Sequence, residues 1–339
     1  MKSVVAPMAL GAMLLAPIQL SAAPVKLNFS YFSSDTTALF RAAVKPFVDA
    51  VNGSGVLEIK MHFSGAFGNL EQQVDLVRNG TVDIAFVVPG YTPNQFPDNA
   101  IIELPGLYRD SAGATATYTG LVAKRDMRGY EEFHVVGTMV APTQNIHTRT
   151  PITSLAGLNG KRIRANNDTT MAALDKLGMI GVQMPLNQAA VAVAGGDIDG
   201  VAVSPQTLFD FGISRFVTNH YLLGVGAAPV AVLMNAKKFA ELPGDARDII
   251  RKYSGEWLGQ RFVTIYEPES LQQIERLKEN PRRNVVTPST ADHAIAANIF
   301  RELISEWAAK SPQHKLLHTA ALREIAKQPS RGSPNGDPQ

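Results

Sequence analysis

One arginine in this 339-residue chain stands where it could capture an anion: Arg164, in the run Gly160-Lys161-Arg162-Ile163-Arg164-Ala165-Asn166-Asn167. Residues 161–164 have the pattern of a short strand that ends on Arg164 and opens into a polar loop. In open α/β sheets, ligands bind in the crevice beyond such strand ends. A guanidinium group is always charged and can hold a carboxylate through two parallel hydrogen bonds, so Arg164 is a candidate anchor for an organic anion. The alternative is a solvated arginine on a strand edge.

The chain lacks the residue patterns of common catalytic and metal sites. Its seven histidines are scattered singly, without the spacing of a zinc site, and no Gly-x-Ser-x-Gly elbow occurs. Asp197 and Asp199 could form a carboxylate pair, but their place between a helix and a strand favours capping and turn formation. The run 224–229 resembles a dinucleotide loop for three positions, yet its final proline favours a tight connection between strands. We therefore expect a binding protein, not an enzyme, with no cofactor and no metal.

The first residues have the pattern of a secretory signal peptide, with Lys2, an apolar stretch over 4–20 and small residues before Pro24. We expect cleavage after Ala22 or Ala23, a periplasmic location and no direct membrane insertion after processing. With 32 basic and 30 acidic residues, the near-balance of charge argues against nucleic acid as a partner. Cysteine is absent, which excludes disulfides and thiol chemistry.

Strand and helix patterns alternate along the chain, which predicts an α/β fold with mostly parallel sheets. The first part is expected to form strands over 25–31, 57–63 and 82–88, separated by helices over 39–51 and 70–79. Pro46 predicts a kink or a late start in the first helix, and Gly80 is expected to be a left-handed cap of the second. A chain of this length usually splits into two domains.

A four-residue pattern, Gly-x-Val/Ile-Asp, occurs at 80–83 and again at 196–199, each time between a predicted helix and a buried strand. It indicates two lobes of similar local design rather than a tandem repeat. Later elements are expected to be strands over 230–234 and 284–286 and helical regions over 244–279 and 291–310. Pro268 should bend or interrupt the first of these helical regions, and the composition of 328–339 predicts a disordered tail.

Several short segments, in order along most of the chain, match the motifs of one family: Ser64-Gly65-Ala66-Phe67-Gly68, Gly80-Thr81-Val82-Asp83, Leu104-Pro105-Gly106-Leu107-Tyr108-Arg109-Asp110, the stretch 152–164, Leu177-Gly178 through Met184-Pro185-Leu186 to Asp199-Gly200, and Met234 to Phe239 with Leu242-Pro243. Together they resemble the extracytoplasmic solute receptors of tripartite ATP-independent periplasmic (TRAP) transporters, of the C4-dicarboxylate type.

That resemblance implies a two-lobed periplasmic-binding-protein fold, each lobe a mostly parallel sheet flanked by helices, with hinge crossovers and a long bracing helix. The expected division is 24–142 with 231–268 for lobe one and 143–230 with 269–327 for lobe two. It further implies that Arg164 clasps the carboxylate of a small organic acid, which the receptor delivers to a TRAP-type membrane permease. The alternatives are a receptor or sensor for another importer class, or an exported hydrolase or lyase acting on a carboxylate.

Seven further residues are candidates for ligand contact: Tyr31, Phe67, Tyr91, Gln144, Leu186, Ser204 and Phe209. For each aromatic residue among them, core packing is the alternative. The chain departs from the family's pattern at Thr143-Gln144, where some members have a second arginine, at Leu186, where an aromatic residue is common, and at 201–205, which replaces a polar Gln-Glu-Asn-Pro. We therefore expect one carboxylate on an otherwise apolar ligand rather than a diacid held at both ends.

Overall fold

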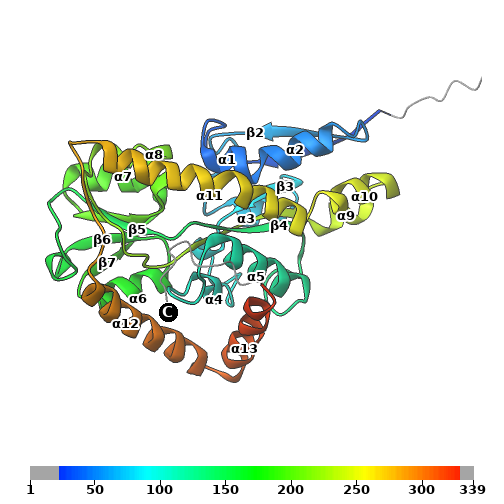
Figure 1. The fold of residues 1–339 in the computed structure, drawn as a ribbon. Helices are drawn as coiled ribbons and strands as arrows, with labels where there is room; N and C mark the ends of the chain where they lie inside the picture. Colours follow the sequence, from blue (N-terminus) through cyan, green and yellow to red (C-terminus); the bar gives the residue numbers. More distant parts are fainter. Residues whose placement is uncertain (1–22, 329–339) are drawn as a thin grey trace, which may run out of the picture.

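The computed structural model describes residues 23–328, so the predicted signal peptide (1–23) and tail (328–339) lie outside the described residues apart from Ala23 and Gln328. The chain forms two halves, each built on one sheet (Figure 1). Lobe one contains the sheet with strand order β2-β1-β3-β10-β4, and lobe two contains the sheet with order β11-β9-β5-β8-β6-β7. The predicted two-lobed α/β architecture is confirmed; the division of the chain by residue ranges stays a prediction.

Lobe one alternates strands and helices along its first hundred residues, as the sequence pattern predicts. Its strands are β1 (Val25–Ser30), β2 (Leu57–His62), β3 (Ile84–Val87), β4 (Phe133–Ala141) and β10 (Ala228–Asn235). Its helices include α1 (Ala38–Ala43), α2 (Lys45–Asn52), α3 (Gln73–Arg78), the turn η1 (Pro89–Tyr91), α4 (Ala100–Glu103), α5 (Ser111–Ala123), α9 (Ala236–Glu241) and α10 (Gly244–Lys252). The break between α1 and α2 at Val44, with Pro46 in the first turn of α2, confirms the predicted kink.

Lobe two has the same alternation. Its strands are β5 (Asn145–Thr148), β6 (Arg162–Ala165), β7 (Ile180–Gln183), β8 (Gly200–Val203), β9 (Asn219–Tyr221) and β11 (Asn284–Val286). Its helices include η2 (Ala156–Leu158), α6 (Asp168–Lys176), α7 (Leu186–Gly195), α8 (Pro205–Asp210) and η3 (Ile213–Arg215). Within the described residues one strand in each sheet runs against the others, β10 in lobe one and β5 in lobe two.

Hydrophobic cores cover both faces of each sheet. Along β3, Phe86 belongs to one apolar cluster and Val87 to another, because successive side chains of a strand point to opposite faces. Along β8, Ala202 and Val203 are divided between two clusters in the same way. Both sheets are therefore buried on both sides, as sheets flanked by helices must be.

The repeated four-residue pattern forms the same local structure in both lobes. Gly80 and Gly196 have positive φ angles of 77° and 84°, which confirms the left-handed position predicted for Gly80. In lobe one, an Asp83 carboxylate oxygen accepts from the Asn28 backbone N–H at 2.7 Å; in lobe two, Asp199 accepts from the Arg162 N–H at 2.8 Å. These carboxylates tie each buried strand to its parallel neighbour, which supports the structural role preferred for Asp199.

Two chain crossovers join the lobes, from β4 to β5 and from β9 to β10. They are paired with each other, since Gln144 N donates to Gly226 O at 3.0 Å and Val225 N donates to Gln144 O at 2.9 Å. A Cβ atom on Gly224 would lie only 2.5 Å from the Thr143 hydroxyl, so glycine permits this close approach. Residues 224–227 thus belong to a connection between strands, as predicted, and 228–229 begin β10.

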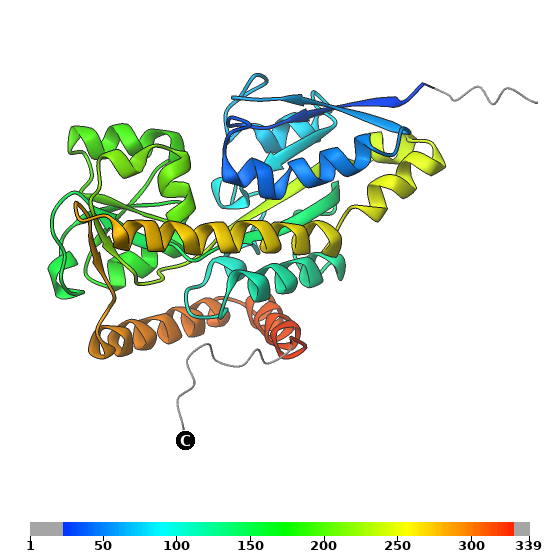
Figure 2. The same ribbon diagram turned by 45° about the horizontal axis from the view of Figure 1, so that its top comes forward.

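Helix α11 (Glu256–Glu279) extends alongside both lobes (Figure 2). It contacts α1, α5 and β4 of lobe one and α8 and β11 of lobe two, the bracing position expected of a long helix. Pro268 was predicted to bend or interrupt the helical region. It does not interrupt the region: α11 runs through Pro268, and the interruption falls before it, at Gly255, where φ is 62°. A residue with a positive φ, such as Gly255, cannot continue a right-handed helix, whereas a helix can tolerate the one backbone hydrogen bond that a proline fails to donate.

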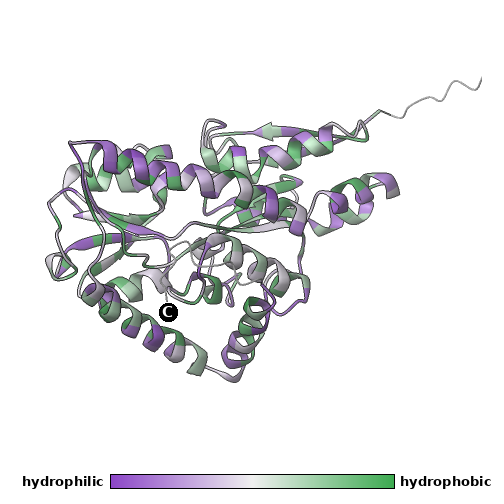
Figure 3. Ribbon diagram, in the orientation of Figure 1, coloured by the Kyte–Doolittle hydropathy of each residue, from purple (hydrophilic) through white to green (hydrophobic). Residues whose placement is uncertain are grey.

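The chain ends on two further helices, α12 (Thr290–Ala309) and α13 (Pro312–Ala326). Helix α12 contacts α6, whereas α13 contacts α5 and α4 of lobe one. Hydrophobic and hydrophilic residues both occur along α11 and α12, as expected of helices with one packed and one solvated face (Figure 3). Among residues 23–328, no helix is both long enough and apolar enough to cross a membrane.

Candidate functional site

Arg164 lies in a cavity between the two lobes. It stands on β6, where it pairs with Val182 of β7 and Val201 of β8, one residue before the strand ends. The cavity, of about 60 Å³, is bounded by the segments that follow the carboxyl ends of β1, β3, β6 and β8, by the crossover from β4 to β5 and by the first residues of β10. Its lining residues are Phe32, Leu39, Leu70, Val88, Tyr91, Ala141, Gln144, Arg164, Asn166, Leu186, Val203, Ser204, Thr207, Phe211, Ala228, Val230 and Tyr266.

The guanidinium of Arg164 is buried without a protein anion beside it. The residue is 2% exposed, its Nε donates to the Met184 carbonyl at 3.0 Å, and its Nη2 donates to the Tyr91 hydroxyl at 2.6 Å. Within residues 23–328 no carboxylate forms an ion pair with it. Because an isolated buried charge is costly, this arrangement is complementary to an anion that enters from outside.

A pair of amide side chains lies beside the arginine. The Gln144 Nε2 donates to Asn166 Oδ1 at 2.9 Å, and the Thr170 hydroxyl donates to the same oxygen at 3.3 Å. Both amides are almost fully buried. Gln144 belongs to the crossover and Asn166 follows β6, so the pair connects the hinge to the strand that carries Arg164.

Hydroxyl groups form a second polar part of the lining. Ser204 caps α8, accepting from the Thr207 N–H at 3.3 Å, and its hydroxyl lies 2.8 Å from that of Thr207. Tyr266, from α11, lines the same cavity as these two hydroxyls. Burial raises the pKa of Tyr266 well above its usual value, so its hydroxyl remains neutral and can donate.

Apolar side chains make up most of the cavity wall, and two of them are aromatic rings from opposite lobes. Phe32 follows β1 in lobe one, and Phe211 follows α8 in lobe two. Their ring centroids are 6.3 Å apart and their planes differ by 11°. Aliphatic residues such as Leu186 and Val203 complete a wall with little hydrogen-bonding capacity.

The structure brings together Arg164, Tyr91, Gln144, Leu186 and Ser204, which all line the cavity. It places three other predicted residues elsewhere. Tyr31 is fully buried in the core of lobe one, where its hydroxyl lies 3.1 Å from that of Thr37. Phe67 is 40% exposed and packs edge-on against His62, and Phe209 packs in a core cluster of lobe two near Arg283.

Two of these placements, those of Tyr31 and Phe209, have simple causes. Side chains alternate along a strand and its continuation, so Tyr31 turns inward while its neighbour Phe32 faces the cavity. Phe209 on α8 and Phe211 just past the helix end both pack against a core cluster, but of these two residues only Phe211 also lines the cavity. The sequence reasoning also missed Tyr266, whose position depends on how α11 crosses the hinge; no local signal marks it.

A buried chain of hydrogen bonds supports the strand end beside the site. Arg283 can only donate hydrogen bonds, so its Nη1 donates to His220 Nε2 at 3.1 Å. The Val203 carbonyl can only accept, so His147 Nε2 donates to it at 3.3 Å. The two Nδ1 atoms are 2.8 Å apart, and His220 must therefore donate to His147. Burial lowers the pKa of both imidazoles, to about 4 for His147, and keeps them neutral.

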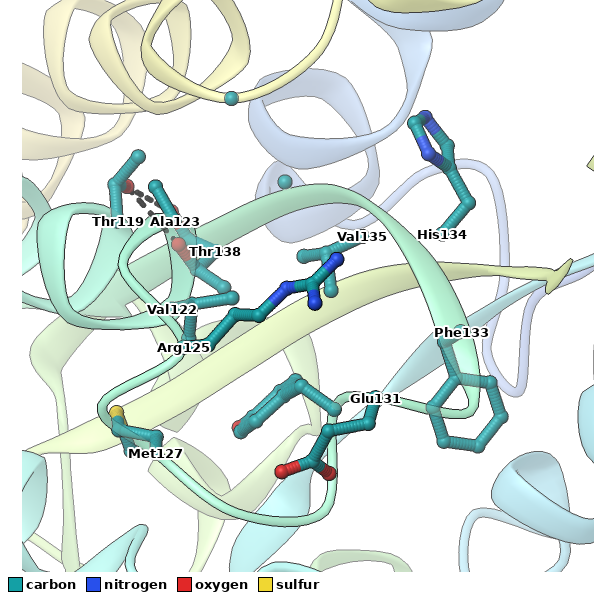
Figure 4. A pocket seen from close by; sticks show the side chains of 13 residues that line it. Thr119, Val122, Ala123, Arg125, Met127, Glu131, Phe133, His134, Val135 and Thr138 are labelled. Carbon is teal, nitrogen blue, oxygen red and sulfur yellow. Dashed lines mark hydrogen bonds between the residues drawn. The ribbon is translucent and has the colours of Figure 1, made fainter.

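A larger hollow, of about 430 Å³, lies within lobe one between α5, β4 and Gly255 (Figure 4). Thr119 and Thr138 on its wall are hydrogen-bonded to each other at 2.9 Å, and its arginine, Arg125, is exposed to solvent. An exposed arginine exchanges one hydrated state for another when it binds an anion, so it offers much less than a buried one. Despite its smaller volume, the cavity between the lobes has the stronger anion-binding chemistry.

Neither hollow has the side chains of a metal centre. Among the described residues there is no group of three or more His, Cys, Asp or Glu side chains placed to hold a metal ion.

A two-lobed α/β fold with a buried cation in a cavity between its lobes is the arrangement expected of a protein that binds a small anion. Comparison with known families agrees over most of the chain: residues 29–311 match the family model described as bacterial extracellular solute-binding protein, family 7. The chain belongs to this family.

Curated relatives are about a quarter identical to the chain over the stretches that align. A solute-binding protein of Verminephrobacter eiseniae (strain EF01-2) is 24% identical over 195 residues, which cover 56% of this chain and 58% of that protein. The 2,3-diketo-L-gulonate-binding periplasmic protein YiaO of Escherichia coli (strain K12) is 26% identical over 231 residues, covering 65% of this chain and 68% of that protein.

Solved structures show the same fold. A TRAP solute-binding protein from a marine metagenome, specific for aromatic acid ligands and crystallised with 3-hydroxybenzoate, has a TM-score of 0.82 at 23% identity, covering 90% of this chain and 99% of that chain. A TRAP solute-binding protein from Rhodoferax ferrireducens T118, in complex with copurified benzoate, has a TM-score of 0.78 at 23% identity, covering 89% and 98%.

Proposed function

We propose that this protein is a periplasmic receptor that binds a small organic acid through Arg164 and delivers it to a TRAP-type membrane permease. One observation carries the proposal: the Arg164 guanidinium is 2% exposed and has no carboxylate partner within the described residues. A hydrogen bond to a charged group contributes about 1.5–3 kcal/mol net. A ligand carboxylate would supply the missing anion.

The ligand we propose is a flat acid with one carboxylate, and aromatic acids of the size of benzoate fit this description. Among the described residues that line the cavity, Arg164 is the one with a formal charge, so a second carboxylate would lack a cationic partner. The parallel rings of Phe32 and Phe211 suit a planar apolar body. Relatives that bind 3-hydroxybenzoate and benzoate support this class, whereas the 2,3-diketo-L-gulonate receptor shows that the family also includes other specificities.

We further propose that the lobes close over the ligand about the two crossovers. Two contacts between the lobes favour the closed arrangement: Arg164 with Tyr91, and the Asp210 carboxylate of lobe two with the Ala38 N–H of lobe one at 2.9 Å. A cavity of about 60 Å³ has room for only a few water molecules, so a larger ligand requires the lobes to move apart.

Two measurements test this function together. Native mass spectrometry of freshly purified protein should show a copurified small acid. Calorimetric titration should then show binding of benzoate but not of benzamide, which has nearly the same shape and no charge. Equal affinity for the two would contradict a carboxylate anchor, and failure to bind any carboxylic acid in a screen would contradict the proposed function.

A further inference from the structure

We infer that the preferred ligand carries, besides its carboxylate, a hydroxyl group that bonds to the side chain of Gln144. This inference rests on the proposed function and specifies the chemistry of the ligand further. It comes from an unpaired polar atom in the cavity lining, the Gln144 Oε1, which is buried and accepts no hydrogen bond from the described residues.

The backbone of Gln144 is held firmly. Its N–H donates to Gly226 O and its carbonyl accepts from Val225 N, both across the paired crossovers. The residue is 2% exposed, and its Nε2 is already bonded to Asn166. Gln144 therefore has little freedom to turn its remaining amide atom toward solvent.

An unpaired buried acceptor is costly, about 1–3 kcal/mol, and most buried polar groups in folded proteins have partners. Other orphaned polar atoms occur in the described chain, among them Ser30 Oγ and Arg247 Nε, but these residues do not line the cavity between the lobes. Among the described residues with such an unpaired atom, Gln144 is the one that lines this cavity together with Arg164. A ligand that meets the arginine can also supply a partner for the amide.

The partner must be a group that suits the surroundings of Arg164. An ammonium group would place a second positive charge near a buried guanidinium, which is unfavourable. A hydroxyl is neutral and can both donate and accept. It therefore satisfies Gln144 in either amide orientation, whether Oε1 or Nε2 is the free atom, since the Asn166 amide can turn with it.

Specificity of this kind is strong because the protein is left with an unpaired group when the ligand lacks the matching one. We therefore expect the hydroxylated acid to bind much more tightly than its parent. The carboxylate would set the overall affinity through Arg164, and the hydroxyl would choose among acids of similar size.

The test compares benzoate with its 2-, 3- and 4-hydroxy derivatives by calorimetry, in the wild-type protein and in Gln144→Met. In the wild type at least one hydroxybenzoate should bind ten times more tightly than benzoate. In Gln144→Met this preference should fall to threefold or less; because it is the ratio of two affinities in the same variant, a change in the overall affinity does not affect it. The matched control is Thr143→Ser, on the same crossover, whose side chain does not line the cavity; it should keep the full preference.

Two results would overturn the inference while leaving the proposed function standing: benzoate binds but no hydroxy derivative is preferred, or the preference persists in Gln144→Met. If Gln144→Met does not fold, the same comparison is made in Gln144→Leu, which also removes the amide. Failure of every carboxylic acid to bind would instead overturn the proposed function, and this inference with it.

Discussion

The Tyr91 hydroxyl of lobe one accepts a 2.6 Å hydrogen bond from Nη2 of Arg164 in lobe two. The two residues are 73 positions apart, and each lies next to the end of a strand, at β3 and β6. A buried cation thus bridges the cleft to a neutral phenol instead of an acid. The Arg164 side chain is therefore both the proposed ligand anchor and one partner in a contact between the lobes.

Tyr91→Phe should weaken binding of an organic acid about fivefold, because a net hydrogen bond across the cleft contributes about 1 kcal/mol. The fold should be unaffected, since the ring remains. Calorimetry with benzoate measures the change, and Tyr253→Phe, on a residue outside the cavity, is the control. Equal affinities for Tyr91→Phe and wild type would show that this contact does not contribute to the bound state.

Phe211→Ala should weaken binding of aromatic acids by tenfold or more, because ring contacts contribute beyond the area that they bury. A small aliphatic acid such as propionate should lose much less. The comparison needs Phe216→Ala as control, since Phe216 is five residues away, 40% exposed and not part of the cavity. An equal loss for benzoate and propionate would argue against ring stacking in the site.

Glu103 should make the stability of the protein depend on pH. Burial, with a smaller contribution from the neighbouring Asp168, raises the pKa of its carboxyl to about 7, although hydrogen bonds from Asn99, Thr169 and Asn167 act against this rise. The folded state therefore holds a proton more tightly than the unfolded chain. This contribution to stability is complete below about pH 4.5 and is lost as the pH rises to about 7.

Glu103→Gln removes the charge and retains an oxygen that can accept from Asn99. We expect it to stabilise the protein at pH 8 by on the order of 1–3 kcal/mol, with little effect at pH 5. Urea unfolding at both pH values measures the difference, and Glu302→Gln on the exposed face of α12 serves as control. A variant that is less stable than wild type at pH 8 would contradict the raised pKa.

The buried histidine pair should have the opposite pH dependence. Burial lowers the pKa of both His147 and His220, so their contribution to stability is complete above about pH 6.5 and is lost as the pH falls toward 4. His147→Gln should flatten the acid side of the stability profile by on the order of 1 kcal/mol per pH unit. His293→Gln, on an exposed residue, should leave the profile unchanged. If NMR shows that His147 and His220 both titrate near pH 6.5, the buried, hydrogen-bonded pair of neutral imidazoles is disproved.

The fold could be predicted well from the sequence because the residues that end its helices and begin its strands act locally. Gly80 and Gly196 lie past helix ends with positive φ, and Asp83 and Asp199 then bond to a parallel strand, so four residues mark the same junction twice. The interruption expected at Pro268 does not occur because a helix can continue through a proline despite the missing backbone hydrogen bond. Whether it does so depends on tertiary packing, and α11 packs against both lobes.

The site was harder to predict because one residue of register decides which side chain enters it. Tyr31 and Phe32 are neighbours of similar character, and only their order on the strand continuation sends Phe32 to the cavity. Arg164 and Gln144 could be placed from strand ends and crossovers. Tyr266 could not, since 102 residues separate it from Arg164 and only the folded path of α11 brings it near (266 − 164 = 102).

The most direct measurement is the affinity of Arg164→Ala for its acid by calorimetry, beside Arg162→Ala, on the exposed first residue of the same strand. Arg164→Ala should remain folded, by circular dichroism and thermal unfolding, and should bind at least tenfold more weakly, a loss of about 1.4 kcal/mol or more. Arg162→Ala should bind as wild type does. If Arg164→Ala is folded and binds the acid with unchanged affinity, Arg164 is not the carboxylate anchor.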